Sequence, residues 1–175
     1  MWRPALAGPS GAIPAPLRDF DYVGAHRYFV TWCCFERRPL FSERLVVERA
    51  TAQNLRACEP SGIAVIAYCF MPDHLHMLVA GVDPRADGRR FFRLAKQYAG
   101  FAHSKMGGGR LWQRYGYEHV VRSTQKSRAV ARYILENPVR AGLASAAGDW
   151  PFSGAPTTNQ AALIEWAYSN DEWSG

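Results

Sequence analysis

Two histidines, His74 and His76, stand two residues apart in the apolar stretch MPDHLHMLV. Side chains on a β-strand alternate between its faces, so both imidazoles point one way while Leu75, Met77 and Val79 point the other. Two steps along the strand separate the histidines by about 7 Å, and both rings can then converge on one small cation or one phosphate oxygen. The pattern alone is weak, because a structural role is about equally common and a metal needs a further ligand.

A tyrosine and an amide stand together in the later segment SRAVARYILENPVRAGL, residues 127–143. Helical spacing puts Tyr133 and Asn137 side by side on one face, together with Ile134. Asn137 precedes Pro138, which disfavours the α conformation of the residue before it and predicts a helix end or a kink there. An amide at such an end can offer its carbonyl oxygen to a cation.

A tyrosine beside a metal site has a specific chemical use. Its phenolate can attack a phosphodiester and form a covalent phosphotyrosine. Because a phenol ionises only near about pH 10, a divalent cation or a base must assist. The alternative is that Tyr133 packs in the core, which helical spacing alone favours by roughly two to one.

The surrounding segments predict an α+β fold. Strands are expected at 27–35, 63–70, 74–79 and 117–122, and helices at 42–57, at 89–106 and from 123 or 124 toward 136. The order β-α-β-β-α-β is that of a ferredoxin-like sandwich, one antiparallel sheet with two helices on one face. The helix that carries Tyr133 is an addition at the C-terminal side. Ser42 is expected to cap the first helix, and Phe101 to lie on the apolar face of the second.

Length and composition indicate one compact domain with a basic surface. The chain has 175 residues, a net charge of +6 and a pI near 9.4, which favours a polyanionic partner such as nucleic acid. Arginine supplies 18 of the 21 basic residues, and its planar guanidinium suits phosphate oxygens and stacks on bases. A GC-rich genome would raise arginine as well, and this alternative has about equal weight.

The four cysteines form no C-x-x-C pair, which indicates reduced thiols rather than a disulfide framework or a metal knuckle. Prolines at positions 4, 9, 14 and 16 interrupt any signal-peptide core, and no apolar run reaches the roughly 18 residues of a membrane span. We therefore expect a cytoplasmic protein with no membrane partner.

Taken together, four sequence stretches resemble a known family. FMPDHLHMLV resembles the His-hydrophobe-His (HUH) signature of single-tyrosine, IS200-like transposases. With LWQRYGYEHVVR, ARYILENPVRAGL and DWPFS, the chain is similar to REP-associated tyrosine transposases in particular, over about residues 27–153. We expect a transposase domain at 21–153, preceded by a flexible Pro/Ala-rich segment at 1–20 and followed by a C-terminal tail at 154–175. Neither terminal segment has a counterpart in the family.

The resemblance also implies residue roles. His74 and His76 would bind a divalent metal, Mg²⁺ or Mn²⁺; Tyr133 would be the nucleophile, and Asn137 the third ligand. The implied reaction is cleavage and rejoining of single-stranded or hairpin DNA through a 5′-phosphotyrosine, by a monomer or a homodimer. Since two imidazoles and an amide bring no charge, the metal should bind weakly before DNA arrives, and manganese suits imidazole better than magnesium.

Contacts to DNA are expected from basic and aromatic side chains. Six would meet the backbone and two would stack on unpaired bases: Arg89, Arg93, Lys96, Arg110, Arg114 and Arg122, then Trp112 and Tyr115. For each, the alternative is a solvated charge or a core aromatic. Two rival functions stay open: a DNA-binding protein that no longer cleaves, and a metal-dependent hydrolase in which Tyr133 is structural.

Overall fold

A five-stranded antiparallel sheet with the strand order β4-β1-β3-β2-β5 forms the centre of the protein. The computed structural model describes residues 20–169. The strands are β1 (Arg27–Cys33), β2 (Ile63–Met71), β3 (His74–Gly81), β4 (Tyr117–Val121) and β5 (Ser153–Gly154). The helices are α1 (Arg44–Arg56), α2 (Gly88–Lys105), α3 (Thr124–Arg140) and α4 (Gln160–Tyr168), with short 3-10 turns at Phe35–Arg37, Leu40–Ser42 and Glu59–Ser61.

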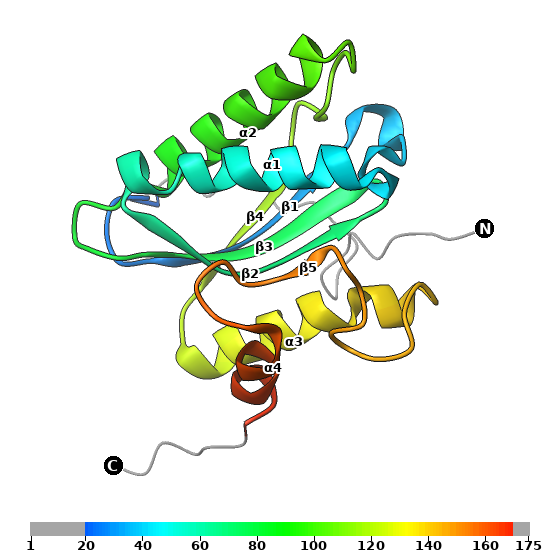
Figure 1. Cartoon of the computed structure of the whole chain (residues 1–175). Coiled ribbons are helices and arrows are strands. Elements are labelled where there is room, and N and C mark those ends of the chain that lie inside the picture. The colour runs from blue at the N-terminus through cyan, green and yellow to red at the C-terminus, as the bar shows by residue number, and fades with distance from the viewer. Residues whose placement is uncertain (1–19, 170–175) are drawn as a thin grey trace, which may run out of the picture.

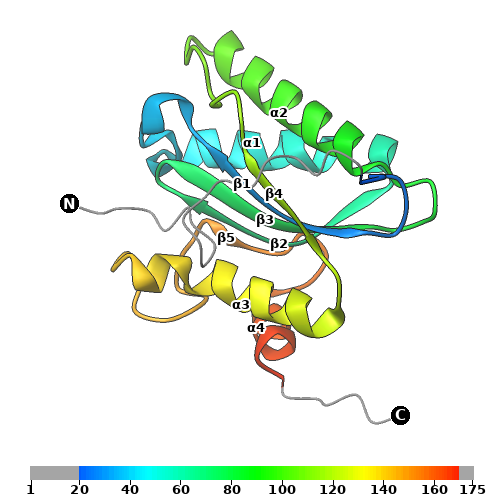
Figure 2. The same cartoon turned by 180° about the vertical axis from the view of Figure 1, so that it is seen from behind.

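The helices form one layer on each side of the sheet. Helices α1 and α2 cover one face, and α3 and α4 lie on the other (Figure 1). The order β1-α1-β2-β3-α2-β4 confirms the predicted ferredoxin-like unit, and α3 is the predicted additional helix that carries Tyr133. Seen from behind, the chain passes from the end of α2 through β4 to the start of α3, so β4 connects the two layers (Figure 2).

Strand β3 is the central strand, paired on one side with β1 and on the other with β2. Its alternation is the predicted one. Leu75, Met77 and Val79 pack in the core beneath α1 and α2, whereas Leu78 packs in the second core beneath α3. His74 and His76, which alternate with Leu75 and Met77, therefore belong to the face that α3 covers.

Each face of the sheet has its own hydrophobic core. Large aromatic side chains fill the first one, where the fully buried Trp32 meets the ring of Phe91. Aliphatic residues dominate the second, in which Ile134 and Leu135 of α3 join Leu163 of α4. Helix α3 is therefore held by apolar burial on the sheet and on α4 rather than by its own propensity.

The start of α2 depends on one glycine. The Asp87 side chain caps the helix by accepting a hydrogen bond from the backbone N–H of Arg90. Gly88 then lies against the buried ring of Tyr28, and a Cβ at this position would come within 2.7 Å of that ring. Only glycine lets the helix begin this close to β1.

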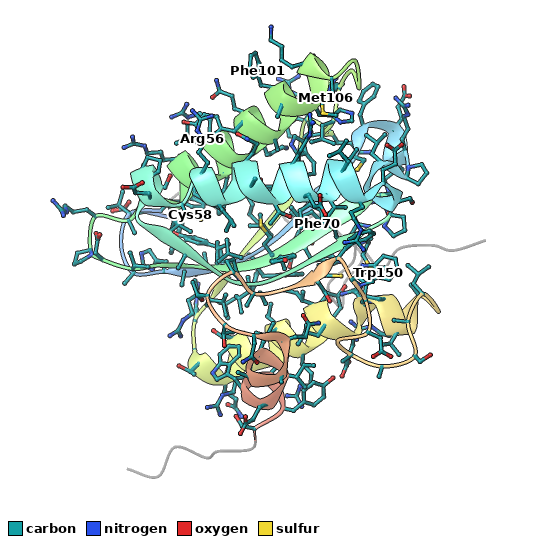
Figure 3. All side chains as sticks on the ribbon, in the orientation of Figure 1. Arg56, Cys58, Phe70, Phe101, Met106 and Trp150 are labelled. Carbon is teal, nitrogen blue, oxygen red and sulfur yellow. The ribbon has the colours of Figure 1, made fainter. Side chains whose placement is uncertain are left out.

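Three local predictions were wrong. Ser42 lies in a 3-10 turn, and α1 begins after Glu43, which makes no side-chain cap. Phe101 is 64% exposed at the outer end of α2, because the apolar stripe of that helix runs through Phe91, Leu94 and Ala95 instead (Figure 3). Of the two outcomes predicted at Asn137, a helix end or a kink, the end is wrong, because α3 continues through Pro138 to Arg140.

The segment after Ser153 contains ordered structure. Gly154 pairs with Tyr68 of β2, and α4 packs on α3 through Leu163 and Ala167. The boundaries predicted at residues 20 and 153 stay predictions, and the first 19 residues lie outside the described part. No described helix is long and apolar enough to cross a membrane. All four cysteines are free thiols, as predicted.

Candidate active site

The two histidines of β3 direct one ring nitrogen each toward a common point. His74 Nε2 lies 3.1 Å from His76 Nε2, and the rings stand nearly perpendicular at 84°. Both side chains are 2% exposed. A hydrogen bond at this distance requires that one of the two Nε2 atoms carries a proton. The two Nε2 atoms therefore face one common point and share one hydrogen there.

Each imidazole is held from behind through its other nitrogen. His74 Nδ1 donates to Asp73 Oδ1 at 2.7 Å, and His76 Nδ1 lies 2.7 Å from Thr31 Oγ1. Thr31 stands directly opposite His76 in the register of β1 and β3, so the sheet itself supplies this contact. Partners of this kind fix the orientation and the tautomer of a metal-binding histidine.

The electrostatics of the pair follow from burial and from neighbouring charges. Burial, with the nearby charges of His74, Arg140 and Arg37, holds the His76 pKa well below its usual value, so this ring is neutral at neutral pH. Burial alone would raise the Asp73 pKa. The hydrogen bond from His74 and the charges of His74 and Arg37 outweigh burial and lower it. Asp73 is thus a carboxylate, and its Oδ2 pairs with Arg37 at 2.8 Å.

Tyr133 of α3 lies over the same face of the sheet. Its ring centroid is 5.7 Å from that of His76 and 5.7 Å from that of Phe29, with edge-to-face geometry in both contacts. Phe29 also stacks on His76 at 5.5 Å. The structure therefore brings together the predicted tyrosine and the predicted histidines, which lie 57 residues apart (133 minus 76) in the sequence.

The last turn of α3 adds a residue that the sequence did not point out. The Arg140 guanidinium lies over the Tyr133 ring, with Cζ 4.4 Å from the ring centroid, and its Nη2 donates to the Tyr133 carbonyl at 2.7 Å. The Asn137 side-chain nitrogen donates to that carbonyl as well, also at 2.7 Å. Arg140 stands seven residues after Tyr133, which places both on one helical face. The helix end or kink expected at Asn137 hid this relation.

The donor set fits a divalent cation, with a place left for other ligands. Two nitrogen ligands at right angles, each about 2.1 Å from an ion, lie roughly 3.0 Å apart, close to the Nε2 separation in this pair. Within residues 20–169 no cluster of three His, Cys, Asp or Glu side chains could hold a metal. Since the Asn137 nitrogen donates to the helix, its oxygen is the atom that remains for a cation.

Most of the residues expected to contact DNA lie along α2 and the segment that leads into β4. Arg93, Lys96, Arg114 and Tyr115 line one pocket, and Arg110 lines the next. Arg89 lies over the Tyr22 ring at the start of α2, and Arg122 is exposed just after β4. Tyr115 is 73% exposed, whereas Trp112 is buried against Trp32 and Phe41, so the structure does not support a base-stacking role for Trp112.

Sequence reasoning missed the residues that hold the site in place. The sequence analysis gave Asp73 no role, and Thr31 appeared only as part of the strand expected at 27–35. The proximity of Asp73 to His74 was a usable signal, because a histidine ligand usually needs an acceptor for its second nitrogen. For Thr31 the sequence carries no such signal, since its contact depends on the register between β1 and β3.

Comparison with known proteins identifies the family of the chain. Residues 22–137 match the family described as "Transposase IS200 like". The chain therefore belongs to the IS200-like transposase family, whose members are enzymes that cleave and rejoin DNA. This confirms the resemblance noted from the HUH signature.

Individual relatives carry the more specific name. A protein of Haemophilus influenzae named as a REP-associated tyrosine transposase is 28% identical over 171 residues, which is 90% of this chain and 92% of that protein. The REP-associated tyrosine transposase of Escherichia coli K12 is 33% identical over 88 residues, about half of each chain. The solved structure of a REP-associated tyrosine transposase bound to a REP hairpin superposes on this chain with a TM-score of 0.69 at 22% sequence identity. The match covers 90% of this chain and 93% of that one and shows that the two share a fold.

Proposed function

We propose that this protein cleaves and rejoins single-stranded DNA through a covalent 5′-phosphotyrosine on Tyr133. The observation that carries the proposal is the meeting of three groups on one face of the sheet: two imidazoles whose Nε2 atoms converge at 3.1 Å, and a tyrosine ring 5.7 Å from one of them. Hairpin DNA of the REP type is the proposed substrate, because a relative that spans nearly the whole chain is named for REP association and the similar solved structure is bound to a REP hairpin.

His74, His76 and Asn137 are the proposed ligands of a divalent metal, Mg²⁺ or Mn²⁺. Bound there, the ion would polarise the scissile phosphate and stabilise the charge that develops on its oxygens. Metal binding would displace the proton between the two Nε2 atoms, and Asp73 and Thr31 hold the rings so that both Nε2 lone pairs are then directed inward. The neutral state of His76 serves the same end, because a protonated ring has no lone pair to offer.

In the chemical step, the Tyr133 oxygen attacks phosphorus as the phenol proton leaves. A bond from that oxygen to phosphorus forms, the bond from phosphorus to the 3′ oxygen breaks, and the leaving oxygen takes up a proton to become a free 3′-OH. Attack by a second 3′-OH on the phosphotyrosine reverses the step and joins DNA without external energy. Arg140 and Asn137 fix the backbone of Tyr133 during both steps.

The test is a denaturing gel of the full chain with labelled hairpin DNA from the flanks of its own gene, in Mn²⁺. Wild type should give a covalent protein–DNA band, and Tyr133→Phe should give none. Tyr117→Phe is the matched control, because Tyr117 contacts the same Phe29 ring at 5.9 Å yet belongs to β4. It should keep the band.

Two outcomes would overturn the proposal. Metal-dependent cleavage that survives in Tyr133→Phe would identify a hydrolase in which histidines activate water. Hairpin binding by wild type with neither cleavage nor adduct, at every metal tested, would identify a DNA-binding protein that no longer cleaves. In solution, the same hairpin complex is expected to contain either a monomer or a homodimer, which light scattering distinguishes.

A further inference from the structure

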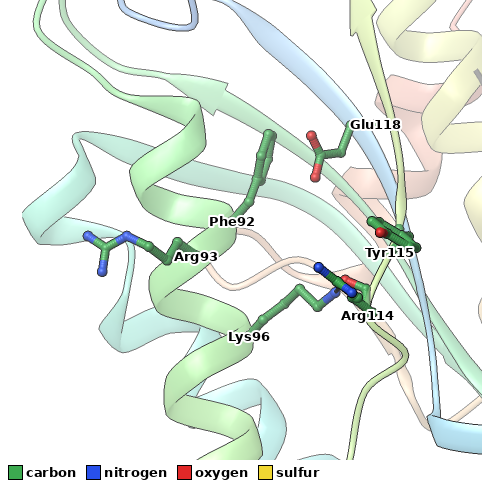
Figure 4. A pocket seen from close by; sticks show the side chains of 7 residues that line it. Phe92, Arg93, Lys96, Arg114, Tyr115 and Glu118 are labelled. Atoms are coloured by element: carbon green, nitrogen blue, oxygen red, sulfur yellow. Dashed lines mark hydrogen bonds between the residues drawn. The ribbon is translucent and has the colours of Figure 1, made fainter. Parts of the chain in front are cut away.

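A pocket of about 240 Å³ lies on the other face of the sheet, away from Tyr133, where α2 meets the start of β4. Phe92, Lys96, Arg114, Tyr115 and Glu118 line it (Figure 4). Drug-sized ligands occupy pockets that begin at about 300 Å³, so this one suits a single small planar group. A neighbouring hollow of about 500 Å³ shares Lys96 and Arg114, and the two together follow α2.

The unusual feature of this pocket is its carboxylate. Glu118 is half-buried among basic side chains, in a protein with a net charge of +6. Burial raises its pKa, although the charges of Lys96 and Arg89 oppose that shift. A carboxylate repels the DNA backbone, so it weakens a surface that only binds phosphate. Its position is better explained if it accepts hydrogen bonds from a base.

We propose that this pocket binds one unpaired guanine of the DNA substrate, with Glu118 as the residue that selects it. Guanine presents two neighbouring N–H donors, N1–H and the 2-amino group, which a carboxylate can accept as a pair. Cytosine and adenine each place a ring-nitrogen lone pair beside their amino group, and this lone pair would face a carboxylate oxygen. Thymine offers one N–H between two carbonyls. Only guanine satisfies both carboxylate oxygens.

The other lining groups complete the fit to a base. Lys96 Nζ donates to the carbonyls of Gln113 and Arg114 at 3.0 and 3.2 Å, which leaves a third ammonium hydrogen for an acceptor such as guanine O6. Tyr115 is largely exposed beside the pocket and offers a ring face for stacking. The Arg114 guanidinium lies over that ring, with Cζ 5.3 Å from its centroid, and can neutralise a flanking phosphate.

The topology connects this pocket to the proposed active site. Tyr117 and Glu118 are consecutive in the edge strand β4, so their side chains point to opposite faces. Tyr117 contacts Phe29, the same ring that touches Tyr133, while Glu118 lines the pocket beside α2. A single strand that wraps the free edge of the sheet can therefore present a base to Glu118 and a phosphate to Tyr133.

The inference rests on the proposed DNA function and is tested by binding alone. The full chain carrying Tyr133→Phe, which cannot form the adduct, is titrated into labelled thymine oligonucleotides that hold one central guanine, hypoxanthine, adenine or cytosine. Fluorescence anisotropy at fixed salt gives each Kd. The guanine oligonucleotide should bind about tenfold more tightly than the adenine or cytosine one, the selectivity typical of one bidentate contact. Hypoxanthine lacks the 2-amino group and should lose most of that gain.

Glu118→Gln is the decisive variant and Glu48→Gln its matched control. Both variants remove one negative charge. Glu48, however, lies on α1 and pairs with Arg44, whereas the pocket is lined by α2 and the segment that leads into β4. Glu48→Gln should tighten the binding of all four oligonucleotides slightly and by the same factor. Glu118→Gln should tighten the binding of the hypoxanthine, adenine and cytosine oligonucleotides in the same way. It should weaken the binding of the guanine oligonucleotide, so that the preference for guanine disappears.

The outcomes separate the pocket from the proposed function. Equal tightening of all four oligonucleotides by Glu118→Gln would show that Glu118 is only a repulsive charge and would overturn the inference. Binding by the Tyr133→Phe chain without any guanine preference would overturn it too. A covalent Tyr133 adduct of the wild-type chain on hairpin DNA would still leave the proposed function standing. Failure to bind any single strand or hairpin would overturn both.

Discussion

Replacing Asp73 with asparagine tests whether the carboxylate behind His74 supports metal binding. The asparagine oxygen can still accept the His74 Nδ1 hydrogen, so the ring keeps its orientation and the main loss is the negative charge. Losing the carboxylate partner of a histidine ligand typically costs about 10- to 100-fold in metal affinity. At roughly 1.4 kcal/mol for each factor of ten, this is about 1.4 to 2.7 kcal/mol. We expect Asp73→Asn to weaken Mn²⁺ binding within that range.

Thr31→Val measures how much metal affinity is lost when a histidine loses a neutral hydrogen-bond partner, for comparison with the loss at Asp73. The Thr31 hydroxyl is neutral and buried, and its hydrogen bond to His76 is worth a net of about 0.5 to 1.5 kcal/mol, or roughly 2- to 13-fold. The charged partner should therefore matter more than the neutral one. Binding is measured on the full chain from the electron paramagnetic resonance signal of free Mn²⁺, with and without hairpin DNA.

Arg37→Gln separates metal support from the stability of the turn. It breaks the same ion pair with Asp73 from the other side but keeps the hydrogen bond to His74. It also removes a positive charge that acts on His76, so Mn²⁺ affinity should hold or rise. Arg37→Gln and Asp73→Asn should lower the temperature of unfolding by similar amounts. If both weakened Mn²⁺ binding by the same factor, the loss would come from the turn, and the reasoning about the carboxylate would be refuted.

Three further predictions concern the nucleophile, the pocket and the core. In a single-turnover assay, Arg140→Gln should slow adduct formation about fivefold, because roughly 1 kcal/mol of cation–π interaction with Tyr133 is lost. Its affinity for the hairpin should change little. Arg132→Gln, on another side of α3, is the control and should not slow the reaction. Acidification should remove the guanine preference at a pH above the usual titration range of glutamate. The reason is that the raised Glu118 pKa causes its carboxylate to be protonated at a higher pH than an ordinary glutamate. A preference that is constant down to about pH 4.5 would contradict this. Leu75→Ala should lower the free energy of unfolding by about 2 to 5 kcal/mol in a urea titration, and a loss below about 1 kcal/mol would show that this side chain is not in the core.

The parts of the site that the sequence predicted are those fixed by local periodicity. Two-residue alternation on β3 put His74 and His76 on one face, and four-residue spacing on α3 put Tyr133 beside Asn137, and the structure has both relations. The parts that depend on tertiary pairing were not accessible. No local pattern shows that Thr31 stands opposite His76, because that register arises from the whole sheet.

Arg140 was missed for a different reason. The rule that a residue before proline avoids the helical conformation predicted a helix end or a kink at Asn137, and tertiary packing carries the helix past that point. Pro138 is buried, and the apolar contacts of Ile134 and Leu135 hold the helix on the sheet beyond the point where its own sequence would stop it. The Tyr133 carbonyl there accepts hydrogen bonds from two side chains.

The central position of β3 implies that the two halves of the active site differ in how they open. Amide hydrogens of His74 and His76 are enclosed by β1 and β2, so their exchange with deuterium requires rupture of the middle of the sheet. Tyr133 belongs to a helix that is attached to the sheet mainly through side chains of the second core, and its amides can exchange in a smaller local opening. Such an opening would carry Tyr133, the proposed nucleophile, away from an intact pair of imidazoles and back again.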